Sequence, residues 1–126
     1  MQLPGVYQAK KKDGTIYYRS SITYQNKHIS LGSYPYEKHA HEAYNEAYKL
    51  LKDTSYRIDS YNEEIYFLSF EKWVVLVNYR DNHIYIKNPI YIMKDYFIYY
   101  IDRETFFLFD VDDLFYYSTH KIMKRG

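Results

Sequence analysis

Alternating hydrophobic and polar residues near the start of the chain predict a β-hairpin. Residues 6–9 form a first short strand, and residues 15–24 form a second. The Asp13-Gly14 pair between them is typical of a hairpin turn, because glycine adopts the positive φ that such a turn requires. The expected inner face of the second strand consists of Ile16, Tyr18, Ser20 and Ile22.

The same alternation predicts a third strand. Gln25-Asn26 forms a second tight turn, and residues 27–31 follow with Ile29 and Leu31 facing inward. Gly32 is expected to end this strand. Three consecutive strands joined by tight turns predict an antiparallel sheet.

After Pro35 the hydrophobic period changes from two residues to 3.6, which predicts a helix from about residue 37 to residue 52. Its apolar stripe consists of Ala40, Ala43, Tyr44, Ala47, Leu50 and Leu51. Alanines let a helix lie close to a sheet, and Ser20 provides a matching small residue on the second strand. The first part of the chain is therefore expected to be three antiparallel strands backed by one helix.

The second half of the chain predicts further short strands, at residues 66–70, 73–79, 84–86, 91–93, 97–101 and 106–109. The apolar run at 73–79 is nearly continuous, as in a strand covered on both faces. Asp110 is expected to cap a terminal helix with Asp112 and Asp113 in its first turn, and the basic residues expected near its end are Lys121, Lys124 and Arg125.

These elements predict an α+β fold in two domains. An N-terminal three-stranded antiparallel sheet packed on one helix occupies residues 1–52, and a second small β-rich α+β region occupies residues 53–126. The boundary is placed at the polar stretch of residues 52–55.

Composition indicates a folded chain. Of 126 residues, 47% are hydrophobic and 21% aromatic, including 19 tyrosines, which is too much apolar surface for a disordered protein. The absence of cysteine excludes disulfides and thiolate metal sites and favours a reducing cytoplasm. Charged pairs interrupt the apolar runs and the N-terminus lacks a signal-peptide pattern, so neither a membrane span nor secretion is expected.

Charge is unevenly distributed along the chain. Residues 1–52 contain eight lysines and arginines against four aspartates and glutamates, a balance of +4, whereas residues 53–126 contain nine against twelve, a balance of −3. A basic half suits a polyanion such as nucleic acid. The alternative, that both halves are ordinary solvated surfaces of one neutral protein, stays open at this point.

Four blocks in the first half resemble the APETALA2/ethylene-response-factor DNA-binding domain and its relatives in phage-borne HNH homing endonucleases. The blocks are Gly5-Val6-Tyr7, Ser20-Ser21-Ile22-Thr23, Ile29-Ser30-Leu31-Gly32-Ser33-Tyr34 and Ala40-His41-Glu42-Ala43-Tyr44-Asn45-Glu46-Ala47. Their order and spacing agree with the family over residues 4–51.

The resemblance implies that the sheet enters the major groove of double-stranded DNA with its outward side chains. Those are Tyr7, Ala9, Tyr17, Arg19, Ser21, Thr23, His28 and Ser30, with Lys10, Lys11, Lys12 and Lys27 as flanking phosphate contacts. Arg19 is the only arginine of this set. Few bidentate base contacts are therefore expected, and sequence discrimination should be weak.

Two stretches of the second half, residues 73–82 and 110–123, resemble the middle region of bacterial proteins that join this DNA-binding module to a C-terminal HNH nuclease. The metal-binding, general-base and positioning residues of such a nuclease cannot be assembled here. The chain ends at Gly126, about where a nuclease segment would begin. Two alternatives stay open: the protein has lost its nuclease, or the chain is cut short.

No catalytic or metal site is expected. His39 and His41 lie two apart on a helix and face different directions, and His120 beside Asp112 and Asp113 is explained by helix capping. There is no glycine-rich phosphate loop, nucleophile elbow or zinc motif, so no cofactor is expected. Tyr7 and Tyr17 either stack on bases or pair with each other across strands.

Two functional hypotheses follow. The first is a non-enzymatic, sequence-weak DNA-binding protein of a phage or mobile element, whose second half mediates dimerisation or partner binding. The alternative is a phage-encoded, anti-CRISPR-like inhibitor that blocks the DNA channel of a host nuclease or other nucleic-acid enzyme. Its acidic surface would comprise Glu63, Glu64, Asp110, Asp112 and Asp113.

Overall fold

The computed structural model describes residues 3–119, and the chain forms two compact units. The first unit comprises Met1–Lys52 and Asn62–Ser69, and the second comprises Asp53–Tyr61 and Phe70–Gly126. Both units contain helices and a three-stranded antiparallel sheet, which confirms the predicted α+β class. Among residues 3–119, no helix combines the length and the hydropathy that crossing a membrane requires.

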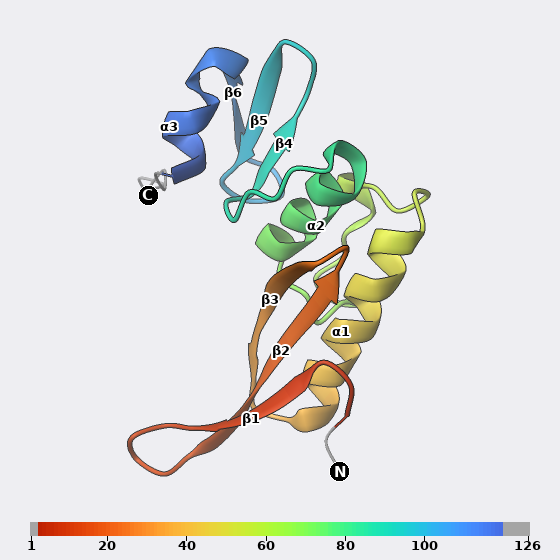
Figure 1. The fold of residues 1–126 in the computed structure, drawn as a ribbon, viewed down its shortest axis with the longest axis vertical. Coiled ribbons are helices and arrows are strands. Elements are labelled where there is room, and N and C mark those ends of the chain that lie inside the picture. The colour runs from red at the N-terminus through yellow and green to blue at the C-terminus, as the bar shows by residue number, and fades with distance from the viewer. Residues whose placement is uncertain (1–2, 120–126) are drawn as a thin grey trace. The chain divides into compact units, whose positions relative to one another are not determined.

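The sheet of the first unit has the order β1-β2-β3, formed by β1 (Val6–Lys10), β2 (Ile16–Tyr24) and β3 (Lys27–Tyr34) (Figure 1). Gly14 has a φ of 92°, and the Thr15 backbone N–H donates to the Asp13 carboxylate at 2.9 Å, so the first predicted turn is confirmed. Gln25 and Asn26 have φ values of 51° and 65°, the double positive φ of a twist-matched hairpin turn.

Strand β3 continues beyond Gly32, so the predicted strand end at this glycine is wrong. The pairing shifts between Ser20 opposite Gly32 and Ser21 opposite Ser30, which leaves Leu31 as the extra residue of a β-bulge. Gly32 has a φ of 116°, a conformation that is open to glycine and strained for other residues. The glycine therefore permits the bulge instead of ending the strand.

Helix α1 (Glu37–Lys52) has the predicted bounds and packs on the sheet through its alanines. Ala40, Ala43 and Ala47 are fully buried against the inner face of the sheet. The Ser20 hydroxyl donates to the Ala40 carbonyl at 2.7 Å, which confirms the predicted close approach of helix and sheet at this serine. Residues that complete the core of this unit are Val6, Ile22, Ile29, Leu31, Leu50, Leu51 and Leu68.

The segment Asn62–Ser69 belongs to the first unit because it is anchored to α1 and to β3. The Glu46 carboxylate accepts hydrogen bonds from the backbone N–H groups of Phe67 and Leu68, each at 3.0 Å. The Tyr34 hydroxyl donates to the Phe67 carbonyl at 3.0 Å. These residues form no strand, so the predicted strand at 66–70 is wrong.

In the second unit, helix α2 (Phe70–Asn82) occupies the apolar run for which a strand is predicted, and that prediction is wrong. Every residue from Trp73 to Tyr79 is buried, and a helix buried all round shows no 3.6-residue period. The thirteen-residue length is what separates such a helix from a strand. A short 3-10 helix, η1 (Ile58–Ser60), precedes it.

The second sheet has the order β4-β5-β6, formed by β4 (Ile90–Ile92), β5 (Tyr96–Tyr100) and β6 (Phe106–Asp110). These strands confirm the last three predicted ones to within a residue or so at each end. Residues 84–86 form no strand, because the Ile84 carbonyl accepts a hydrogen bond from the Asn78 side chain at 3.1 Å instead of a ladder bond. The buried core beneath this sheet consists of Ile86, Ile90, Phe97 and Tyr99.

The chain then continues through η2 (Val111–Asp113) into α3 (Leu114–Thr119). The Asp110 carboxylate accepts from the Asp112 backbone N–H at 2.9 Å, so Asp110 is a cap as predicted, but it caps the 3-10 turn η2, which contains Asp112 and Asp113, and not α3 itself. Its predicted basic C-terminal residues, Lys121, Lys124 and Arg125, lie outside the described residues, as does His120.

Candidate nucleic-acid interface

The outward side chains of the β1–β3 sheet lie on the face opposite α1. Tyr7 lies opposite Arg19 and Ala9 opposite Tyr17 between β1 and β2. Between β2 and β3, Thr23 lies opposite His28 and Ser21 opposite Ser30. The structure therefore brings all eight predicted groove-facing residues onto one three-stranded face.

Most of this face is accessible. The side chains of Arg19, Thr23, His28 and Ser30 are exposed, and Tyr7 is 54% exposed. Ala9 and Tyr17 are half-buried. Ser21 is only 7% exposed on the central strand next to the bulge, which leaves it little surface for binding DNA.

Two pairs of side chains on this face hold each other in place. An Arg19 Nη2 donates to the Tyr17 hydroxyl at 3.0 Å, and the guanidinium carbon lies 5.7 Å from the centroid of the Tyr17 ring. The Thr23 hydroxyl and His28 Nδ1 lie 3.3 Å apart. A guanidinium has five N–H donors, so Arg19 keeps further donors for a ligand while its position over the sheet is fixed.

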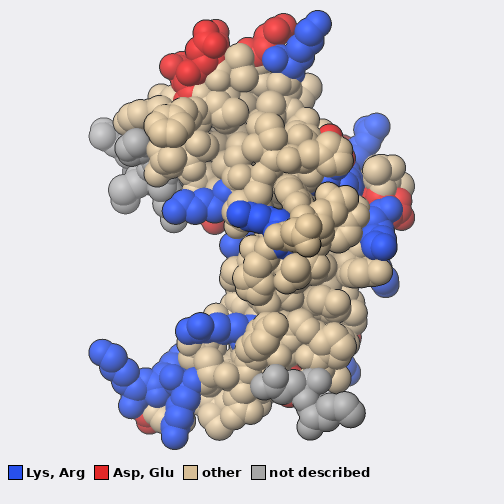
Figure 2. Space-filling model, in the orientation of Figure 1, with Lys and Arg blue, Asp and Glu red and all other residues tan. Residues whose placement is uncertain are grey.

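Lysines gather at the hairpin that joins β1 and β2. Lys10, Lys11 and Lys12 are all exposed, and Figure 2 shows basic side chains clustered where this hairpin lies in Figure 1. Lys27, at the turn between β2 and β3, is also exposed. Hydrogen bonds from Thr15 lower the pKa of the nearby Asp13 carboxyl. This carboxylate is therefore ionised, and it stabilises the turn by accepting from the Thr15 backbone N–H. Residues 6–34 thus carry five basic residues against one acid.

The charge balance of the first unit is smaller than that of residues 1–52. Segment 62–69 adds Glu63 and Glu64, which leaves eight basic residues against six acidic ones. The positive charge is therefore a property of the sheet and its hairpin and not of the whole unit.

The five acidic residues of the inhibitor hypothesis fall into different units. Glu63 and Glu64 lie in the first unit, and Asp110, Asp112 and Asp113 lie in the second, where β6 leads into η2. Asp110 is engaged as a cap. The acidic surface is thus not assembled within one compact unit.

The histidines of α1 have separate structural roles. The His39 ring stacks on Phe67 with centroids 4.6 Å apart, and His41 Nδ1 lies 3.0 Å from the Pro4 carbonyl. Within the described part of the chain, no three histidine, aspartate or glutamate side chains are grouped to hold a metal ion.

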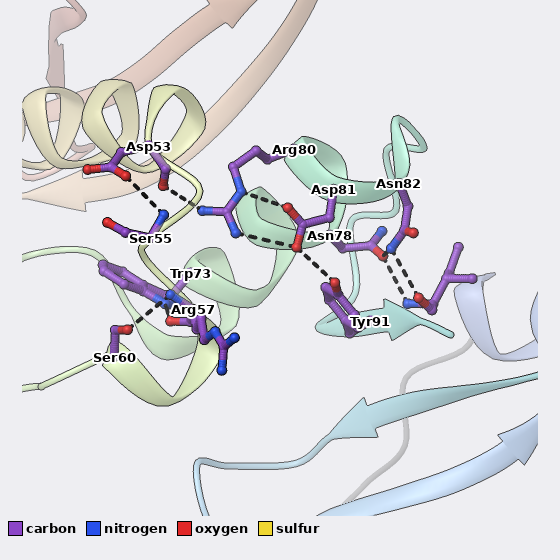
Figure 3. A network of polar contacts seen from close by, with 11 residues as sticks. Asp53, Ser55, Arg57, Ser60, Trp73, Asn78, Arg80, Asp81, Asn82 and Tyr91 are labelled. Carbon is purple, nitrogen blue, oxygen red and sulfur yellow. Dashed lines mark hydrogen bonds and ion pairs between the residues drawn. The ribbon is translucent and has the colours of Figure 1, made fainter. Parts of the chain in front are cut away.

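The second unit contains a polar network that the sequence patterns do not predict (Figure 3). Arg80 pairs with Asp81 at 2.8 Å and donates to the Asp53 carbonyl at 2.9 Å, and the Tyr91 hydroxyl donates to Asp81 at 2.8 Å. Burial and the Asp81 hydrogen bond and charge raise the pKa of Tyr91 to about 12. The one signal in the sequence is the run Asn78-Tyr79-Arg80-Asp81-Asn82 at the end of an apolar stretch, since buried polar groups require partners.

Comparison of the chain with protein-family models, with curated proteins and with solved structures finds no match.

Proposed function

We propose that the open face of the β1–β3 sheet binds double-stranded DNA, and that the protein acts by binding and not by catalysis. The observation that supports this most is the uncovered face on which Arg19 lies among aromatic and hydroxyl side chains, next to a hairpin with three exposed lysines. A β-ribbon fits the major groove of B-form DNA.

Each part of this surface suits one component of DNA. Lys10, Lys11 and Lys12 would bind phosphates, which supply affinity without sequence information. Arg19 suits the guanine edge, since a guanidinium can donate to two acceptors there. A single arginine gives about 1–3 kcal/mol of base discrimination, so binding would be weakly sequence-specific.

The biological setting belongs to the same proposal. The absence of cysteine and the resemblance to modules of mobile endonucleases favour a phage or mobile-element protein that works in the cytoplasm of its host. The second unit would then mediate self-association or binding to another protein.

The test is a titration of fluorescent random duplex DNA at two ionic strengths, followed by anisotropy. Binding should weaken steeply with salt. The Lys10→Ala, Lys11→Ala, Lys12→Ala triple variant should reduce the slope of log K against log salt by roughly 0.9 for each phosphate that is no longer neutralised. The control is the Lys38→Ala, Lys49→Ala double variant, which removes two positive charges at exposed positions of α1 and should leave the slope unchanged.

An unchanged slope in the triple variant would overturn the proposal. Absence of duplex binding at low salt would overturn it as well, and it would favour the inhibitor hypothesis, which requires no affinity for free DNA.

A further inference from the structure

The second unit contains an open cleft of about 660 Å³. Residues 54–59, α2 and all three strands of the second sheet contribute to its walls. Its size falls within the range of small-molecule sites in proteins. Its lining residues combine three arginines, two aspartates and a group of aromatic and aliphatic side chains.

One wall of the cleft is aromatic. The rings of Phe70 and Tyr100 have centroids 5.5 Å apart, and those of Tyr100 and Phe106 lie 5.7 Å apart. Phe106 is 51% exposed although it is a large apolar residue. The planes of Phe70 and Tyr100 differ by 81° and those of Tyr100 and Phe106 by 50°, so the exposed Phe106 ring is the surface on which a planar ligand can stack.

Two of the three arginines can bind an anion. The Arg80 guanidinium is already bound by the Asp81 carboxylate and the Asp53 carbonyl, so Arg80 is part of the wall. Arg57 and Arg103 are exposed, and no carboxylate among residues 3–119 forms an ion pair with either. Figure 3 shows the Arg57 guanidinium apart from the Arg80–Asp81 pair.

The backbone around Arg57 is fixed from two sides. Its N–H donates to the Ser60 hydroxyl at 3.0 Å, and its carbonyl accepts from the Trp73 indole N–H at 2.8 Å. Trp73 is itself buried in α2. The backbone at Arg57 is therefore fixed, so binding a ligand has to order only the side chain of this residue.

An acceptor lies close to the aromatic wall. Asp59 is exposed on η1 and lines the cleft, and its charge adds to burial in raising the pKa of Tyr100. Such a carboxylate accepts hydrogen bonds from a hydroxyl or an amino group of a ligand.

We propose that this cleft binds a mononucleotide. The base would stack on Phe106 at the aromatic wall, Arg57 and Arg103 would hold the phosphate, and Asp59 would accept from the sugar hydroxyls or a base amino group. The guanidinium fork matches phosphate geometry, and the Asp59 carboxylate in the lining disfavours a densely charged polyphosphate. The shared chemistry, a base with one phosphate, is present in a free nucleotide and in the 5′-phosphorylated end of a single strand.

The test is calorimetric titration of the full chain with AMP, CMP, GMP and UMP, with adenosine, with inorganic phosphate, and with a short 5′-phosphorylated single strand. At least one nucleotide should bind more tightly than phosphate or nucleoside alone. Stronger binding by the single strand than by every free nucleotide would assign the strand end as the source. Stronger binding by a free nucleotide than by the single strand would identify the free nucleotide as the ligand of the cleft.

Variants separate the parts of the site. Arg57→Ala and Arg103→Ala should each weaken nucleotide binding roughly tenfold, which corresponds to about 1.4 kcal/mol for the loss of a charged hydrogen bond at an exposed site. Phe106→Ala should weaken nucleotide binding and leave phosphate binding unchanged. Lys87→Ala, an exposed cation of the same unit outside the cleft lining, is the matched control.

Two results would overturn this assignment: no nucleotide or strand end binds at millimolar concentration, or the Arg57→Ala and Arg103→Ala variants bind as the parent does. Tryptophan fluorescence of the buried Trp73 confirms that each variant is folded. Duplex binding through the first sheet should be unaffected by these variants, so the outcome is independent of the DNA-binding proposal.

Discussion

The Glu46 side chain of α1 caps the returning chain at Phe67. Both carboxylate oxygens lie 3.0 Å from the Phe67 backbone nitrogen, and one also lies 3.0 Å from that of Leu68. Burial raises the pKa of Glu46 above its usual 4.5 and outweighs the two backbone hydrogen bonds, which act to lower it. A helix residue far away in sequence thus ties segment 62–69 into the first unit.

This relationship predicts a pH-dependent stability. Because the folded-state pKa is the higher one, folding favours the protonated carboxyl. The stabilisation is complete below pH 4.5 and is lost as the pH rises through the folded-state pKa. Glu46→Gln keeps an acceptor for the backbone and does not titrate, so urea midpoints of this variant should depend less on pH above 4.5 than those of the parent. Parallel pH profiles of parent and variant would exclude this role.

The close contact between Gly5 and the Tyr44 ring predicts that adding a side chain at position 5 destabilises the protein. Gly5 has a φ of 78°, and a Cβ at this position would collide with the Tyr44 ring. Gly5→Ala should lower the free energy of unfolding by about 2–6 kcal/mol, since backbone strain and overpacking each cost about 1–3 kcal/mol. Gly14→Ala is the matched control, because Gly14 also has a positive φ and its Cβ would meet only the end of the Lys10 side chain. Equal losses in urea denaturation would contradict the steric explanation.

Asn78 is fully buried, and its side chain makes three hydrogen bonds. Its Nδ2 donates to the Ile84 carbonyl, and its Oδ1 accepts from the Ile92 backbone N–H and from the Asn82 side chain. Asn78→Leu leaves the partly buried Ile84 carbonyl and Ile92 N–H without these partners and should destabilise the protein by about 2 kcal/mol. Asn82→Ala, which retains both backbone hydrogen bonds of Asn78, should cost less. Thermal unfolding of the two variants measures the difference, and a smaller loss for Asn78→Leu would refute this assignment.

Local patterns predicted those elements whose cause is local. The 3.6-residue stripe after Pro35 predicted α1 with its correct bounds, and Asp13-Gly14 predicted its turn because the conformation depends on that glycine. The bulge at Leu31 depends on pairing with β2, so Gly32 alone could not reveal it. The run at 73–79 has no period to interpret, since it is buried on every side.

The candidate sites also differ in how much of each could be predicted from the sequence. The outward face of the first sheet follows from strand alternation, and its residues were predicted from the sequence. The role of Glu46 has no signal in the sequence, because its partners come from a segment whose return to α1 has no local signature. Likewise, Arg57 and Arg103 line one cleft only through the tertiary fold of the second unit.

Asp81 and Tyr91 predict a measurable pKa coupling. Burial acts to raise the pKa of Asp81, but hydrogen bonds from Arg80 and Tyr91 together with the Arg80 charge outweigh it, so the pKa lies below the usual 3.8. Tyr91→Phe removes one of these hydrogen bonds and should raise the Asp81 pKa, as followed by carboxyl chemical shifts in an NMR titration. The acid limb of stability, lost as the pH falls through the folded-state pKa, should then begin at a higher pH. An unmoved carboxyl titration would show that Tyr91 contributes nothing to it.

The Arg19–Tyr17 pair predicts that some substitutions change the affinity for duplex DNA without changing its dependence on salt. Arg19→Lys keeps the charge but loses the planar fork, so it should leave the salt slope unchanged and weaken duplex binding by about 1–3 kcal/mol if Arg19 binds a guanine edge. Tyr17→Phe removes the hydroxyl that holds Arg19 at 3.0 Å and should cause a smaller loss of affinity with the same slope. Phosphate binding by Arg19 predicts a different pattern, in which Arg19→Lys binds nearly as well as the parent and only Arg19→Ala reduces the slope. Anisotropy titrations of the three variants on one duplex therefore determine which component of DNA this arginine binds.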